Sequence, residues 1–84
     1  METIERFKVK AETFLKNNTQ TFIEDISHNY FFCEIVRIDR DFLIIENFAG
    51  KRSGEVDKIY FSDILRFEEY EEKGEVGGGK WIFI

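Results

Sequence analysis

The first part of the chain shows the spacing of apolar residues that an amphipathic helix requires. Between residues 3 and 16 the apolar side chains recur with a period of about 3.6 residues; they are Ile4, Phe7, Ala11, Phe14 and Leu15. Thr3 can cap the start of this segment, and Asn17-Asn18 supplies polar residues that tolerate the left-handed conformation at a helix end. The spacing therefore predicts an N-terminal α-helix over residues 3–16.

After Asn18 the pattern changes to short apolar runs that are broken by polar residues. The breaks recur about every ten residues, proline is absent, and β-branched and aromatic side chains dominate, which is typical of a small antiparallel sheet or barrel. The pattern predicts strands at residues 20–26, 30–38, 42–47, 57–61 and 65–70, with a one-turn connector at 62–64.

Two of the predicted strands have informative faces. The third is apolar on both faces through Phe42-Leu43-Ile44-Ile45, so we expect it to be central in the sheet and covered by the helix. The fifth alternates Leu65 and Phe67 with Arg66 and Glu68. Because this alternation leaves one apolar face and one polar face, the fifth strand suits a sheet edge.

Length and composition limit the chain to one small domain. Its 84 residues are too few for two cores, and 43% hydrophobic with 17% aromatic residues is too apolar for a disordered chain. We expect this domain at residues 1–70, followed at 71–84 by an acidic, glycine-rich tail. The tail ends in Trp81, Ile82, Phe83 and Ile84. We expect these four residues to dock on the domain or on a neighbouring copy as an extra strand, and the alternative is that they bind a partner protein.

The charge balance bears on partners and location. Twelve basic and seventeen acidic residues give a net charge of -5, which argues against a duplex-DNA binder but does not exclude a local basic patch. Glu2 and Glu5 stand where a secretory signal would be basic, and no segment approaches the ~18 apolar residues of a membrane span. We therefore expect a cytoplasmic protein that does not enter the membrane.

The inventory for catalysis is poor. Cys33 is the only cysteine and lies in an apolar run, so it predicts a buried, inert thiol and excludes a disulfide or a multi-cysteine zinc site. His28, the only histidine, falls in a predicted turn, so no nucleophile and base can be paired. Asp39 and Asp41 lie in a tight polar connection, where carboxylates more often supply turn hydrogen bonds than acid/base chemistry. We expect no enzymatic activity, no metal and no cofactor.

Basic and aromatic residues occur together in one long loop. Lys51 and Arg52 lie in this loop with Phe48 and Tyr60 nearby, and Arg40 lies at another hairpin. Cationic groups for phosphates and aromatic faces for bases are what single-stranded RNA needs. The alternative is an ordinary solvated loop.

The helix, the five strands and the one-turn connector together resemble the Sm-like (LSm) family of small SH3-like barrels. Residues 30–47 look like the first Sm motif, with an aromatic lead-in, apolar alternation, Asp39 in the turn and an apolar third strand. Residues 59–67 occupy the place of the second motif. The resemblance covers about residues 3–70 and implies a mostly β fold: an N-terminal α-helix followed by a five-stranded, strongly bent antiparallel SH3-like/Sm-like barrel.

The departures from the family concern its RNA site. Cys33 stands where the family usually has glycine in the bent second strand, and Leu43 stands where RNA-binding members present asparagine. Phe61-Ser62 replaces the Arg-Gly pair of the second motif, so the uridine pocket does not carry over intact. The candidate RNA-binding residues are therefore Asp39, Arg40, Phe48, Lys51, Arg52 and Tyr60.

The resemblance implies a homo-oligomer, expected to be a ring, in which the fourth strand of one copy pairs with the fifth strand of the next. Such a ring would bind single-stranded RNA or act as a scaffold for ribonucleoprotein. The alternative is an SH3-like protein-protein interaction module with no nucleic-acid binding, which the acidic net charge and the apolar C-terminal segment favour.

Overall fold

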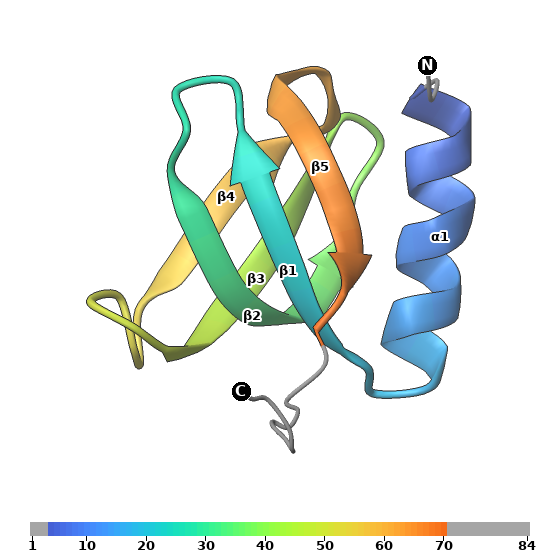
Figure 1. The fold of residues 1–84 in the computed structure, drawn as a ribbon. Helices are drawn as coiled ribbons and strands as arrows, with labels where there is room; N and C mark the ends of the chain where they lie inside the picture. Colours follow the sequence, from blue (N-terminus) through green and yellow to red (C-terminus); the bar gives the residue numbers. More distant parts are fainter. Residues whose placement is uncertain (1–3, 71–84) are drawn as a thin grey trace, which may run out of the picture.

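The computed structural model describes residues 4–70, which form one α-helix followed by a five-stranded antiparallel sheet (Figure 1). The elements are α1 (Ile4–Lys16), β1 (Gln20–Asp25), β2 (Tyr30–Ile38), β3 (Phe42–Ala49), β4 (Val56–Tyr60), the 3-10 turn η1 (Phe61–Asp63) and β5 (Ile64–Glu69). The predicted fold class, mostly β with an N-terminal helix and a bent five-stranded antiparallel sheet, is confirmed. Thr3 and the predicted tail, residues 71–84 with Trp81 to Ile84, lie outside the described residues.

The strands follow the order β4-β3-β2-β1-β5, and every neighbouring pair is antiparallel. The pairing of β2 with β3 shifts register between Phe32 and Cys33 and again between Ile35 and Arg37. Bulges of this kind bend a strand and increase its twist. The sheet therefore curls, and β4 and β5 remain as its two edges, joined through η1 (Figure 1).

The helix ends where the sequence predicts. Asn18 has a φ of 53°, the left-handed conformation that stops a helix, and the amide N–H of Asn17 donates to the carbonyl of Thr13 at 3.1 Å. Thr19 N donates to Phe14 O at 2.9 Å, which ties the first residue beyond the turn to the last helical turn. This connection sends the chain directly into β1.

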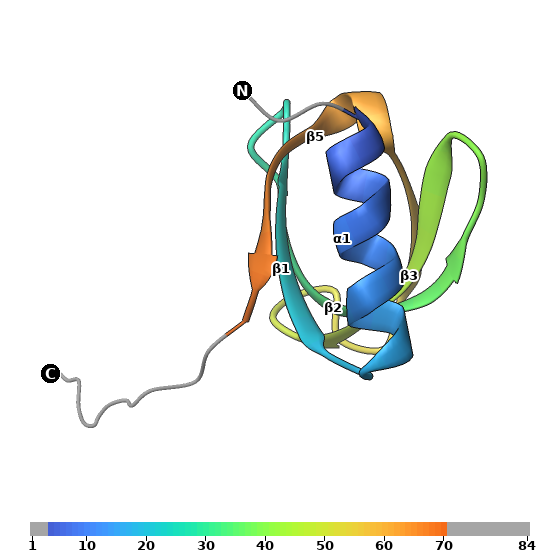
Figure 2. The ribbon, with the colours of Figure 1, turned by 90° about the vertical axis from the view of Figure 1, so that its right-hand side faces the viewer.

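The core lies inside the curled sheet, with α1 placed across its open side (Figure 2). Its buried apolar residues are Phe7, Ala11, Ile23, Phe31, Cys33, Ile35, Leu43, Ile45, Ile59, Phe61, Ile64 and Phe67. Phe67 of β5 joins the two layers, because its ring centroid lies 5.9 Å from that of Phe7 and 5.4 Å from that of Phe14. Lys10 Nζ also donates to the carbonyl of Phe67 at 2.8 Å. The helix is thus fastened to a sheet edge.

The expectation that the helix covers a doubly buried third strand is wrong. In β3, Leu43 and Ile45 are fully buried, whereas Phe42 and Ile44 on the other face are only half-buried. The helix packs against β2, η1 and Phe67 instead. Because the sheet curls, its own strands fill the inner face of β3 and leave the outer face toward solvent.

The predicted alternation of the fifth strand is also broken. Leu65 is 50% exposed, whereas Ile64 and Phe67 are buried. The pairing of β1 with β5 shifts register between Glu24 and Asp25, opposite this point, and a bulge inserts an unpaired residue into the alternation. The apolar side chain of Leu65 therefore reaches the surface at the sheet edge.

Within residues 4–70 there is no helix long and apolar enough to cross a membrane.

Candidate functional site

The six candidate residues fall at two ends of β3. Asp39 and Arg40 lie in the β2–β3 turn, and Tyr60 joins them because the antiparallel register pairs it with Phe42 at the start of β3. Phe48, Lys51 and Arg52 lie at or beyond the other end of that strand. The two groups are separated by roughly 20 Å at about 3.3 Å per residue. The expectation that Tyr60 lies near Lys51 and Arg52 is therefore wrong.

The first group, which we name the turn patch, consists of Arg37, Asp39, Arg40, Phe42, Lys58 and Tyr60. The guanidinium of Arg37 forms an ion pair with Asp39, with Nε donating to Oδ2 at 3.1 Å. The hydrogen bond from Arg37 is the main cause that lowers the pKa of the Asp39 carboxyl below its ordinary value. The carboxylate of Asp39 is therefore already engaged within the turn.

The aromatic rings of the turn patch are also engaged. The centroids of Phe42 and Tyr60 lie 5.6 Å apart, and Lys58 Nζ lies 4.5 Å from the first and 5.4 Å from the second. A cation over a ring face occupies the surface on which a base would stack. Arg40 is exposed at the tip of the turn. The patch combines charge and rings, but the carboxylate of Asp39 and the rings of Phe42 and Tyr60 already have partners within it.

Phe48 of the second group belongs to a row of rings on the outer face of the sheet, which we name the aromatic patch. Its members are Phe22, Tyr30, Phe32, Phe48 and Tyr70. The ring centroids lie 5.8 Å apart for Phe22 and Tyr30, 5.6 Å for Phe22 and Phe32, 5.7 Å for Phe32 and Tyr70, and 5.3 Å for Phe48 and Tyr70. Tyr30 is 54% exposed, whereas the other four rings are half-buried. The row ends in an accessible ring.

A pocket of about 490 Å³ lies at this accessible end, between the β1–β2 turn and the β3–β4 loop. We name it the loop pocket. Its lining includes His28, Tyr30, Phe32, Lys51 and Arg52. A volume of this size falls within the range of small-ligand pockets. The structure thus joins the basic pair of the loop to two aromatic residues of β2.

Gly50 brings the β3–β4 loop close to the aromatic patch. Its φ is 82°, in the left-handed region that favours glycine, and a Cβ there would lie 3.6 Å from the ring of Phe32. A side chain of ordinary length would lie against this ring and strain the backbone. Glycine therefore allows the loop to turn where Lys51 and Arg52 meet the rings.

A buried amide fixes the rest of the loop. Asn47 is 2% exposed, and its Nδ2 donates to the carbonyl of Glu55 at 3.0 Å and to Asp57 Oδ2 at 2.8 Å. Its backbone N donates to Glu55 O at 2.9 Å, and its carbonyl accepts from Gly54 N at 2.8 Å. The loop that carries Lys51 and Arg52 is therefore tied back to β3 by hydrogen bonds, although the sequence pattern did not single out Asn47.

The two basic residues of the loop, Lys51 and Arg52, differ in their contacts within the chain and in their exposure. The guanidinium carbon of Arg52 lies 4.9 Å from the ring centroid of Phe31, and its charge helps to lower the pKa of Asp25. Arg52 is half-buried, whereas Lys51 is exposed. Lys51 is thus the better placed of the two for a contact with an incoming anion.

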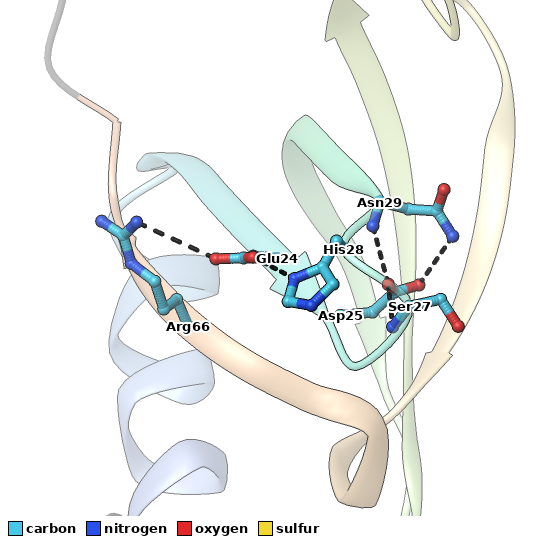
Figure 3. A network of polar contacts seen from close by, with 6 residues as sticks. All are labelled: Glu24, Asp25, Ser27, His28, Asn29 and Arg66. Carbon is cyan, nitrogen blue, oxygen red and sulfur yellow. Dashed lines mark hydrogen bonds and ion pairs between the residues drawn. The ribbon is translucent and has the colours of Figure 1, made fainter.

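The opposite wall of the loop pocket is built by the β1–β2 turn. Figure 3 shows the polar contacts within this turn. Asp25 Oδ1 accepts from the backbone N of Ser27 and from that of Asn29, both at 2.9 Å, and Asp25 Oδ2 accepts from Asn29 Nδ2 at 3.2 Å. His28 adopts a φ of 65° in this turn. The carboxylate of Asp25 therefore holds the turn that leads into Tyr30.

Beside the turn, Glu24 lies between two basic side chains (Figure 3). The side chain of Glu24 is 9% exposed; His28 Nδ1 lies 2.8 Å from its Oε2, and Arg66 Nη1 lies 3.9 Å from its Oε1. The guanidinium of Arg66 also lies 5.2 Å from the ring centroid of Phe22. This network connects the turn, β5 and the aromatic patch.

The hydrogen bonds that Asp25 accepts predict a free energy of unfolding that depends on pH. Burial alone would raise the pKa of Asp25, but the bonds from Asn29 and Ser27 and the charge of Arg52 lower it below its ordinary value of 3.8. The pKa of Asp25 is thus lower in the folded chain than in the unfolded chain. The stabilisation is therefore complete at pH values above the unfolded pKa, and it is lost as the pH falls through the folded pKa. We expect Asp25→Ala to lower the unfolding free energy by about 1 kcal/mol at neutral pH, discounted for solvent screening.

Urea unfolding of wild type and Asp25→Ala at neutral pH and near pH 3 would test this. The difference between the two proteins should shrink as pH falls below 3.8, the ordinary pKa of the Asp25 carboxyl, because the unfolded chain then takes up a proton that the folded carboxyl resists. An equal difference at both pH values would show that Asp25 acts through packing and not through its charge.

The remaining chemistry of the described part is limited. Cys33 is fully buried, and burial is the main cause that raises the pKa of its thiol to about 12. Its sulfur is therefore protonated at neutral pH, as the sequence predicted for an inert thiol. Among residues 4–70 no group of three or more His, Cys, Asp or Glu side chains is placed to hold a metal ion.

A second depression, of about 540 Å³, lies between α1 and β5. We name it the edge groove. It is lined mainly by apolar side chains, among them Ile4, Phe7, Phe61, Leu65 and Phe67. Ile4 and Leu65 are 47% and 50% exposed. An accessible apolar surface therefore runs along the outer side of an edge strand.

Tyr30 and Phe32 are the site residues that sequence reasoning missed. A signal was present, because Phe32 alternates with Cys33 and shares its side of the strand with Glu34. An aromatic residue on the polar side of a strand predicts an outward-facing ring. What the pattern did not contain is the neighbourhood of this ring, since the loop with Lys51 is far along the chain.

No protein-family model matches the chain, and comparisons with curated proteins and with solved structures gave no significant match. The class of protein is therefore defined by the architecture itself, a small bent antiparallel sheet with an N-terminal helix.

Proposed function

We propose that the protein is a cytoplasmic, Sm-like homo-oligomer that closes into a ring and binds single-stranded RNA or serves as a ribonucleoprotein scaffold. One observation carries the proposal: β4 and β5 are the two edges of a strongly bent sheet. An open edge presents unpaired backbone groups and is a template for pairing with another chain. When β4 of one copy pairs with β5 of the next, both edges are covered in one heterologous contact that can repeat around a ring.

The side chains at both edges support this assembly. On β4, Val56 and Tyr60 are 63% and 44% exposed, and on β5 Leu65 projects beside the edge groove. Exposed apolar residues at a sheet edge lose contact with water when a neighbouring strand docks.

RNA binding is the second part of the proposal. Lys51, Arg52 and Arg40 would attract phosphates, Phe48 and Tyr60 would offer ring surface to bases, and Asp39 would lie within the turn as in the first Sm motif. The affinity should fall as salt rises, because bound phosphates release counterions. The proposal includes no enzymatic step, since the described part offers no nucleophile paired with a base.

The rival proposal is an SH3-like module that binds protein and no nucleic acid. One structural observation favours it: Lys58 covers the rings of Phe42 and Tyr60, so the turn patch offers little free stacking surface. The net charge of -5 favours it as well. This rival predicts that partner binding is insensitive to salt. It also predicts that the purified protein carries no nucleic acid.

Light scattering coupled to size exclusion tests the ring. We expect a closed species of about five to eight copies, since heterologous contacts whose rotation closes generate a ring. A clean monomer near 10.1 kDa would overturn the ring and favour the protein-interaction module. A titration with a fluorescein-labelled oligouridylate at two salt concentrations then tests RNA binding on the same sample.

A further inference from the structure

We infer that the loop pocket is a nucleotide subsite for single-stranded RNA, in which one base stacks on Tyr30 and Phe32 and its phosphate contacts Lys51. This inference rests on the proposed RNA binding and deepens it, because it names the stacking residues and places them away from Tyr60. Four observations support it.

The first observation is that the exposed ring of Tyr30 and the nearby ring of Phe32 are both packed against other rings. Tyr30 is 54% exposed, and Phe22 supports its ring at a centroid distance of 5.8 Å. Phe32, in the same pocket, is held between Phe22, at 5.6 Å, and Tyr70, at 5.7 Å. Because these rings pack on one another before any ligand arrives, little side-chain freedom is lost when a base stacks on them.

The second observation is an exposed cation in the same pocket as the rings. Lys51 lines the same pocket as Tyr30 and is exposed on a loop tied down by Asn47. Arg52 lines the pocket as well. Aromatic faces beside cationic groups are the combination by which proteins bind single strands, with rings for bases and cations for the backbone.

The third observation is the presence of polar groups suited to a base edge. Asn29 and Glu55 also line the loop pocket. The amide oxygen of Asn29, whose Nδ2 already donates to Asp25, can accept from a base, and a carboxylate accepts from an exocyclic amino group. A lone basic patch would bind any anion, whereas this lining distinguishes a nucleotide from inorganic phosphate.

The fourth observation is that the other candidate rings, Tyr60 and Phe48, are partly covered. Lys58 Nζ lies 5.4 Å from the ring centroid of Tyr60. Phe48 is half-buried and packs on Tyr70 at 5.3 Å. Of the aromatic residues near basic groups, Tyr30 therefore has the most exposed ring surface in a pocket.

The test compares two exposed residues of β2, Tyr30 and Val36, in the full chain. Fluorescence anisotropy with a labelled oligouridylate and a labelled oligoadenylate should show that Tyr30→Ala weakens binding about tenfold or more, as the loss of one stacked base predicts. Tyr30→Phe should retain binding, because it keeps the ring. Val36→Ala is the control, because Val36 is 53% exposed on the same strand and does not line the loop pocket; it should change the affinity by less than about twofold.

Lys51→Glu provides a second measurement, the salt dependence of binding, which a purely structural role of Lys51 would not change. It should weaken binding of both oligonucleotides alike and reduce the salt dependence by about one phosphate contact. Far-UV circular dichroism and oligomer mass should stay unchanged in these variants, because Tyr30, Lys51 and Val36 are all exposed.

The outcomes separate the two proposals. If wild type binds RNA and Tyr30→Ala binds it as tightly as wild type, the pocket assignment is wrong and RNA binding stands. If wild type binds neither oligonucleotide under low salt, RNA binding itself is wrong and the pocket assignment falls with it. Inorganic phosphate that competes as well as a nucleoside monophosphate would also overturn the assignment, because it would show a plain anion site.

Discussion

Replacing Phe67 with alanine should lower the free energy of unfolding by about 3–5 kcal/mol, the range for loss of a large buried aromatic side chain. Phe67 is 2% exposed and contacts the rings of both Phe7 and Phe14, so the cavity would open between α1 and β5. A chain of this size has a small stability margin, because small domains bury less of their surface. The variant should therefore be largely unfolded or lose the docked helix.

Thermal and urea unfolding followed by circular dichroism would measure this effect. Val9→Ala is the control, because Val9 lies on α1, the helix that Phe67 contacts, and is 63% exposed. It should change stability by about 0.5 kcal/mol or less. A loss below about 1 kcal/mol for Phe67→Ala would mean that the helix does not depend on this contact. Because unfolding of an oligomer depends on concentration, both variants should be compared at the same protein concentration.

The second large effect concerns assembly. We expect Leu65→Glu to convert the proposed ring into monomers, because the new carboxylate would be placed in the edge groove beside β5. Leu65 is 50% exposed in the single chain, so the substitution costs little within the barrel itself. Burying an unpaired charge in an interface between copies costs far more. The mass in solution should fall toward that of one chain, 10.1 kDa.

Val36→Glu is the control for charge and exposure. Val36 is 53% exposed on β2, a central strand, and not on either edge. Its substitution adds the same charge to the same sheet and should leave the oligomer intact. If Leu65→Glu remains oligomeric while its spectrum is native, contact through the β5 edge is wrong. If both variants dissociate, the interface lies on the face of the sheet and not along its edges.

These predictions separate fold, assembly and ligand. Phe67 tests the barrel alone, Leu65 tests the contact between copies, and Tyr30 tests the nucleotide subsite. The protein-interaction module remains the alternative if the barrel is stable, the chain is monomeric and neither oligonucleotide binds. In that case the edge groove beside β5 would be a surface to which a peptide could add a strand.

The candidate site was only partly readable from the sequence. Lys51 and Arg52 were recognised because two basic residues lie in a glycine-containing loop. The pairing with Tyr60 was wrong, since antiparallel register places that ring beside Phe42. Tyr30 was missed because the chain separates it from Lys51 by two strands' length, and only the curled sheet brings both into one pocket.

The sequence by itself determined the local elements of this protein. The apolar stripe of residues 4–15 produced the helix, Asn18 ended it in the left-handed conformation, and alternation placed Cys33 inward. These features depend on neighbours a few residues apart, which a linear pattern contains.

Only the tertiary structure decided which strands meet and where the register shifts. The pairing of β1 with β5 and its bulge brought Leu65 to the surface, against its alternation. The bends of β2 brought the rings of the aromatic patch next to a distant loop. The physical reason is that a period of two assigns a side chain to a face but carries no information about the partner strand, which is selected by packing of the whole barrel.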